Sequence, residues 1–133
     1  MSYATYGTMY NGGKTEDEPE PTNPTVVKVQ SDDHRTELVS QNTVVVIDYY
    51  ADWCGPCKHV TPQFEELSKK WSGIPKLIFA KEDVDDQMEH PPVNGVPCFH
   101  FFVKGNNIPD LMILGGDLTD VEKHLMNLFN QKD

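Results

Sequence analysis

The feature that most constrains this chain is a pair of cysteines, Cys54 and Cys57, placed between a predicted strand and a predicted helix. Residues 43–50, before the pair, are mostly β-branched or aromatic, which is typical of a strand covered on both faces. A helix that begins beside the first sulfur directs its free N–H groups and the positive end of its dipole at that atom. This lowers the pKa of the first thiol, so the pattern indicates reversible thiol–disulfide chemistry.

The spacing of the two cysteines alone leaves other chemistries open, because zinc sites and c-type haem sites use the same spacing. No second pair of this spacing and no H-x-x-x-H pattern follows in the sequence, so a structural zinc site lacks ligands. No histidine directly follows Cys57, which excludes haem attachment. We therefore expect neither a metal ion nor a cofactor.

Charge and composition restrict the partners of this chain. With 11 basic and 21 acidic residues its net charge is −10, and no basic patch is present for nucleic acid or an anionic membrane. The first residues resemble neither a secretory signal nor a mitochondrial transit peptide, and no apolar segment is long enough to span a membrane. Three cysteines, an odd number, argue against a stapling disulfide framework. We expect a reducing, cytoplasmic compartment.

Several motifs in a fixed order resemble the thioredoxin family, of the cytosolic reducing type with a Trp-Cys-Gly-Pro-Cys active site. The resemblance covers roughly residues 25–131. It rests on these segments: Val45-Val46-Ile47-Asp48, Ala51-Asp52-Trp53-Cys54-Gly55-Pro56-Cys57-Lys58, Pro62, Asp83-Val84-Asp85-Asp86, Gly95-Val96-Pro97-Cys98-Phe99 and Gly115-Gly116.

The resemblance implies an α/β fold, a five-strand mixed sheet flanked by helices, over residues 25–133. Hydrophobic patterning places strands at about 26–30, 43–50, 76–84, 97–103 and 109–114, the last two joined as a hairpin by a turn at 104–107. The chain departs from the family pattern after the third strand. Only ten residues separate Asp85 from Val96 and they include Pro91-Pro92, so the helix there is expected to be shortened or lost, with at most one turn near 86–89.

Residues 1–24 differ in composition from the rest of the chain. They combine three tyrosines with an acidic run and three prolines, and such a segment buries too little apolar surface to order itself. We interpret it as a flexible tail. The tyrosines are residue types enriched at interfaces, so the tail is also a candidate docking segment for a second copy or a larger assembly.

Asp48 is a carboxylate inside an otherwise apolar strand, and such a residue needs a reason, because burying an unpartnered charge is costly. Desolvation is expected to raise its pKa toward neutrality. In the resembled family the matching residue accepts a proton from the second cysteine, so Asp48 is a candidate general base. Lys81 aligns with the family lysine that approaches this carboxylate. The alternatives are a structural ion pair and an exposed strand lysine.

The resemblance also implies a surface that binds an extended substrate chain. It implies a cis Val96–Pro97 peptide bond facing the disulfide, with the backbone of Val96 pairing with substrate. The Gly-Pro pair between the cysteines resembles reducing members more than oxidising ones. The full set of implied substrate contacts is Trp53, Gly55, Pro56, Val96, Pro97 and Gly115.

Other reactive side chains have ordinary explanations. Cys98 is interpreted as a small core residue, with a third redox or metal-binding thiol as the alternative. His59 is expected on the surface and His100 in a structural role. Glu82 stands where an apolar residue is expected, and with Glu89 it is predicted to add negative charge near the substrate groove.

These observations predict a thiol–disulfide oxidoreductase that reduces protein disulfides. Cys54 is expected to be the accessible nucleophile and Cys57 the buried resolving thiol. The implied electron donor is thioredoxin reductase or an equivalent. Two alternatives remain: a thioredoxin-fold assembly protein docked by its tail with secondary redox activity, and a disulfide isomerase or oxidase.

Overall fold

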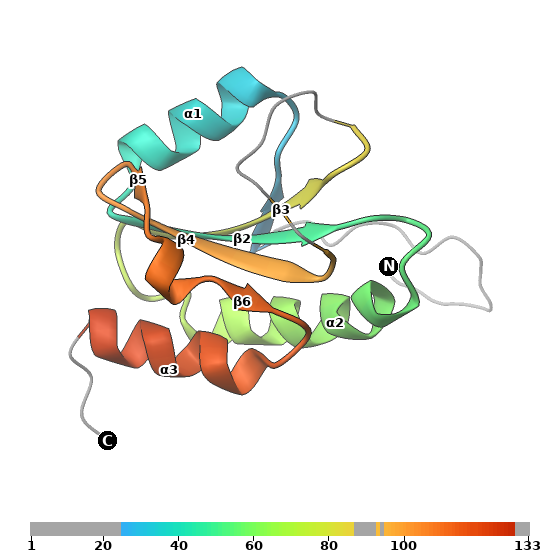
Figure 1. Ribbon diagram of the computed structural model, residues 1–133. Helices are drawn as coiled ribbons and strands as arrows, with labels where there is room; N and C mark the ends of the chain where they lie inside the picture. The colour runs from blue at the N-terminus through green and yellow to red at the C-terminus, as the bar shows by residue number, and fades with distance from the viewer. Residues whose placement is uncertain (1–24, 87–92, 94, 130–133) are drawn as a thin grey trace, which may run out of the picture.

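The computed structural model describes residues 25–86, 93 and 95–129 (Figure 1). The predicted tail at 1–24 lies outside the described residues, and so do residues 87–92, where the shortened helix is expected. In the described part, a single mixed sheet has helix α1 on one face and helices α2 and α3 on the other (Figure 1). These layers confirm the predicted fold class.

The helices are α1 (Asp32–Gln41), α2 (Gly55–Lys70) and α3 (Leu118–Leu128), with a short 3-10 helix, η1, at Pro109–Leu111. The strands are β1 (Val26–Lys28), β2 (Val44–Tyr50), β3 (Leu77–Asp83), β4 (Cys98–Val103), β5 (Asn106–Asn107) and β6 (Ile113–Leu114). None of the helices in the described part of the chain is both long and apolar enough to cross a membrane.

Strand β2 lies at the centre of the sheet. The strand order is β1-β3-β2-β4-β5, and β6 also pairs with β4. β2 runs parallel to β3 and antiparallel to β4. Helices cover both faces of this strand, which explains its nearly continuous apolar sequence. Its carboxyl end leads directly into the loop that carries Cys54.

The region after β4 differs from the predicted hairpin. Lys104 and Gly105 both have positive φ, at 52° and 86°, and form a tight two-residue turn. The turn is therefore shorter than expected and leaves Asn106 and Asn107 to pair with β4. Pro109 lacks an N–H for the ladder and suits the first position of a helix, so η1 interrupts the predicted strand 109–114. The sheet thus has six strands in the described residues, two of them very short, instead of five.

Side chains of alternate residues fill two cores, one on each face of the sheet. The core under α2 and α3 includes Val44, Val46, Phe64, Phe79, Phe99, Phe101, Val121 and Leu125. The core under α1 includes Val29, Val45, Ile47, Tyr49, Ala80, Cys98 and Phe102. Each strand of the sheet centre therefore contributes to both cores, and neighbouring residues such as Asp48 and Tyr49 face different helices.

Glu82 corrects the sequence-based prediction for this residue. Its side chain is completely buried, and Oε2 accepts a 2.7 Å hydrogen bond from Nη1 of Arg35 on α1. The Arg35 guanidinium also lies 3.2 Å from Asp32 on the same helix. Glu82 therefore adds no exposed charge to a substrate groove, because its charge is paired on the α1 face of the sheet. Glu89 lies outside the described residues.

Candidate active site

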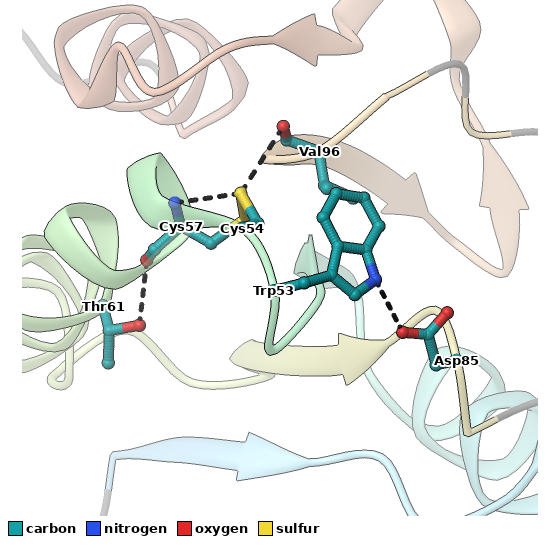
Figure 2. Close-up of a disulfide and its surroundings, with 6 residues drawn as sticks. All are labelled: Trp53, Cys54, Cys57, Thr61, Asp85 and Val96. Carbon is teal, nitrogen blue, oxygen red and sulfur yellow. Dashed lines mark hydrogen bonds between the residues drawn. A yellow bond between two sulfur atoms is a disulfide. The ribbon is translucent and has the colours of Figure 1, made fainter.

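Cys54 is the N-cap residue of helix α2, and Cys57 lies in its first turn. The two form a disulfide whose Cα atoms are 5.3 Å apart. The backbone N–H of Cys57 donates a hydrogen bond of 3.1 Å to Sγ of Cys54, as Figure 2 shows. A helix N-terminus normally receives this bond through a side-chain oxygen. Here sulfur takes that place, so the free N–H groups of the helix stabilise a thiolate on Cys54.

The two cysteines are both nearly inaccessible in this disulfide form. Cys54 is 4% exposed and Cys57 is 2% exposed. The predicted contrast between an accessible and a buried sulfur is therefore absent in the oxidised protein. The difference that the structure does show is electrostatic, because only Cys54 occupies the cap position.

The segment at Val96 and Pro97 faces the disulfide. The Val96–Pro97 peptide bond is cis, as the resemblance implies. The carbonyl oxygen of Val96 lies 3.7 Å from Sγ of Cys54 (Figure 2). The N–H of Gly115 donates a 2.9 Å hydrogen bond to the carbonyl of Pro97. Gly115 has φ +108°, a conformation that favours glycine, so this residue holds the Pro97 segment from the side of β6.

Gly116 is a site residue that the sequence analysis does not assign. A Cβ atom at this position would lie 2.9 Å from Cγ2 of Val60 and 3.9 Å from Cγ of Pro97. Glycine is thus needed for the close approach of this loop to α2. The Gly-Gly pair in the sequence was the available signal, although spacing alone does not say which glycine packs against the helix.

Trp53 directly precedes Cys54 and is 71% exposed. Its indole Nε1 donates a 2.9 Å hydrogen bond to Oδ2 of Asp85 (Figure 2). The N–H of Asp85 in turn donates to Oδ1 of Asp83 at 2.9 Å. Asp85 is a second residue that the sequence analysis does not assign to the site. It fixes the orientation of a large exposed ring beside the cysteines.

Asp48 is only 3% exposed and lies on the sheet face covered by α2. Burial raises the pKa of its carboxyl from 3.8 to about 7, while the positive charge of Lys81 opposes the shift. Lys81 is paired with Asp48 in the register of β2 and β3, so both side chains share this face. The structure therefore brings together the two residues that the sequence suggests as partners.

A family model described as Thioredoxin matches residues 25–124. The chain belongs to the thioredoxin family. It is 35% identical to the thioredoxin of Coprinus comatus over 93 residues, which are 68% of this chain and 85% of that protein. It is 37% identical over 86 residues to Thioredoxin-like protein 1 of Schizosaccharomyces pombe, covering 62% of this chain and 29% of that longer protein.

Solved thioredoxin structures have the same fold. The crystal structure of Malassezia sympodialis thioredoxin superposes with a TM-score of 0.68 at 32% identity, covering 83% of this chain and 97% of that one. As a member of this family, the protein is a thiol–disulfide oxidoreductase, and Cys54 and Cys57 form its redox-active pair.

Cys98 belongs to the core and not to this pair. It is 1% exposed and packs in the α1-side core, which confirms its interpretation as a small core residue. Burial raises the pKa of its thiol. His100 is 4% exposed, contacts the ring of Tyr49 edge-on and lies 3.2 Å from the amide of Asn107. His59 is exposed on α2, as expected.

The raised pKa of Asp48 predicts how stability depends on pH. The folded protein holds a proton on Asp48 more tightly than the unfolded chain does, so this residue favours folding at low pH. The contribution is lost as pH rises from about 4 through about 7. Asparagine does not ionise, so the Asp48→Asn variant does not lose this contribution to stability as pH rises. Its stability advantage over wild type should therefore grow by about 4 kcal/mol between pH 4 and pH 8.

Urea unfolding of the oxidised protein across this pH range measures the difference. Asp120→Asn, on the exposed surface of α3, controls for the removal of one negative charge. An advantage of Asp48→Asn that stays constant with pH contradicts the raised pKa.

Proposed function

We propose that this protein reduces disulfides in other proteins by a two-step exchange. The thiolate of Cys54 attacks a substrate disulfide, and one substrate sulfur leaves as a thiol. The thiol of Cys57 loses its proton, attacks the mixed disulfide and releases the second substrate thiol. The substrate gains two electrons and two protons, and the Cys54–Cys57 disulfide forms. The observation that carries this proposal is Cys54 at the cap of α2, bonded to Cys57.

An extended substrate chain binds across the disulfide in this proposal. The Val96 carbonyl, 3.7 Å from the Cys54 sulfur, supports a backbone contact beside the reacting atom. The exposed Trp53 ring provides further contact area beside the disulfide, and Gly55 and Pro56 are exposed at the start of α2. Pro97 is itself buried, so its part is to shape the segment that presents Val96, with Gly115 holding it in place.

Asp48 serves as the proton acceptor for Cys57 in the second step. A carboxyl with a pKa of about 7 is half ionised near neutral pH, which suits a general base. Lys81 supports this role because its charge limits the rise in pKa. A fully desolvated carboxyl without a cation would hold its proton more tightly.

The reduced form is regenerated by an electron donor of the thioredoxin reductase type, in a reducing cytoplasmic compartment. The cysteine usage supports this setting, because two of the three cysteines form the redox pair and the third is a buried free thiol. Assembly through residues 1–24 remains a prediction from the sequence.

Trapping of the mixed disulfide tests the proposed exchange. In Cys57→Ser the second step cannot occur, so incubation with insulin should accumulate a covalent adduct at Cys54. Non-reducing electrophoresis and mass spectrometry detect this adduct. Cys54→Ser is the matched control, and it should form none. An adduct that forms equally in both variants would show that Cys54 is not the nucleophile.

The proton-acceptor role of Asp48 has a kinetic test. Asp48→Asn should slow insulin reduction by about 100-fold or more at neutral pH, because Cys57 loses its base. The rise in rate of the wild type around pH 7 should also disappear, and that titration belongs to the Asp48–Cys57 pair. Asp52→Asn, an exposed neighbour, is the control. Identical pH–rate profiles for Asp48→Asn and wild type would refute the role.

A further inference from the structure

A buried charge lies on the face of the sheet opposite α2, where neither step of the exchange uses it. Glu82 on β3 is completely buried and bonded to Arg35 of α1 at 2.7 Å. Arg35 itself is only 12% exposed. A buried ion pair is costly to form, because both ions lose their hydration, and replacement by apolar residues is often neutral or stabilising. Stability alone therefore gives a weak reason for this pair.

The pair lies at the end of a row of residues that crosses the sheet. In the strand register, Glu82 stands beside Tyr49 of β2, and Tyr49 stands beside Cys98 of β4. Tyr49 and Cys98 are buried at 0% and 1% exposure. Burial raises the pKa of Tyr49 above its usual range; Glu82 and Cys98 add to the rise, and the positive charge of Arg35 opposes it.

The residues just beyond the ends of these strands pack at the disulfide. Val84 follows the end of β3, Ala51 follows the end of β2, and Val96 lies two residues before the start of β4. Ala51 is buried in one cluster with Cys54 and Cys57, and Val84 and Val96 pack against that cluster. Val84 and Val96 also pack against the α1-side core that contains Tyr49 and Cys98. These two valines therefore join the α1 side of the sheet to the redox site.

The same segments carry the groups that surround the reacting sulfur. Val96 presents its carbonyl to Cys54, and the N–H of Val84 donates a 2.9 Å hydrogen bond to the carbonyl of Tyr50. Asp85, which orients Trp53, directly follows Val84. Figure 2 shows Val96 and Asp85 on either side of the Trp53 ring. A displacement of β3 or β4 at this end would move both of these proposed substrate contacts, the Val96 carbonyl and the Trp53 ring.

We propose that Arg35 and Glu82 are positioning residues for substrate binding: their ion pair fixes α1 on β3 and so holds Val84 and Val96 against the disulfide. An ion pair suits this task because it is satisfied in one geometry, whereas apolar contacts tolerate sliding of a helix over a sheet. The predicted effect on substrate binding rests on the proposed function. The predicted effect on the position of the Val96 segment does not.

The test uses the double variant Arg35→Leu/Glu82→Leu, which removes both charges of this pair at once. Asp32 also loses Arg35 as a partner, but its side chain is 33% exposed and keeps contact with solvent. A second double variant, Lys70→Leu/Glu122→Leu, removes the 2.6 Å ion pair between α2 and α3 on the other face of the sheet and serves as a control. Urea unfolding establishes that both variants are folded. Should the first variant fail to fold, Glu82→Gln, which keeps the shape of the side chain, replaces it.

Hydrogen exchange of the Gly115 amide tests the positioning role without any measurement of disulfide reduction. This N–H bonds to the Pro97 carbonyl and so reports the position of the segment after Val96. In the Arg35/Glu82 variant it should exchange about tenfold faster at unchanged global stability, because local opening becomes easier. The control variant should exchange as wild type does. Unchanged exchange in the Arg35/Glu82 variant overturns the proposal.

Kinetics supply the second readout. The KM for insulin should rise about fivefold in the Arg35/Glu82 variant with kcat nearly unchanged, because the extended chain is held less well. The rate with cystine, a small disulfide that needs no extended contact, should stay at the wild-type value. An equal loss with both disulfides would place the effect on the sulfur chemistry and overturn the positioning role. If the wild-type protein reduces cystine but not insulin, the proposed function is refuted. The hydrogen-exchange experiment then still tests the positioning role of Arg35 and Glu82.

Discussion

Cys54 caps the N-terminus of helix α2, so the free N–H groups of the first turn meet a sulfur atom where most helices present a side-chain oxygen. This interaction constrains the rest of the fold. The central strand β2 must end just before the loop that carries the cysteine, and the helix must start within that loop. The chain must also return on the far side of the sulfur, which the Val96–Pro97 segment does with support from Gly115 and Gly116.

Two buried carboxylates on opposite faces of the sheet, Glu82 and Asp48, have different surroundings. On the α1 face, Glu82 lies 2.7 Å from the guanidinium of Arg35. On the α2 face, Asp48 has only the more distant influence of Lys81, so desolvation dominates and its pKa moves to about 7. A group that titrates near neutrality can exchange protons during the reaction, whereas a group held in an ion pair can keep elements in position. The difference follows from the partner and not from the degree of burial.

Most local features of this fold could be predicted from the sequence, whereas among the long-range pairings only that of Asp48 with Lys81 was suggested, through the family resemblance. Ser31 and Asp117 are residue types that favour helix caps, and they cap α1 and α3 through N–H groups only two or three residues away. The partner of Glu82 is 47 residues distant, and that of Trp53 is 32 residues distant, so both depend on how elements dock. The turn after β4 is shorter than predicted because Lys104 adopts a left-handed conformation, which is uncommon for a residue other than glycine. The cis Val96–Pro97 bond was predicted only through the family resemblance.

The central claim is that the cap position, and not exposure, makes Cys54 the reactive thiol. Alkylation of the reduced full-length protein with iodoacetamide, followed by mass spectrometry across a range of pH, measures each thiol separately. The account predicts that Cys54 reacts fastest, with a pH midpoint well below that of an ordinary thiol, because the helix N-terminus stabilises its thiolate. Cys57 and the buried Cys98 should react far more slowly. Equal rates and a common midpoint for all three cysteines would contradict the account.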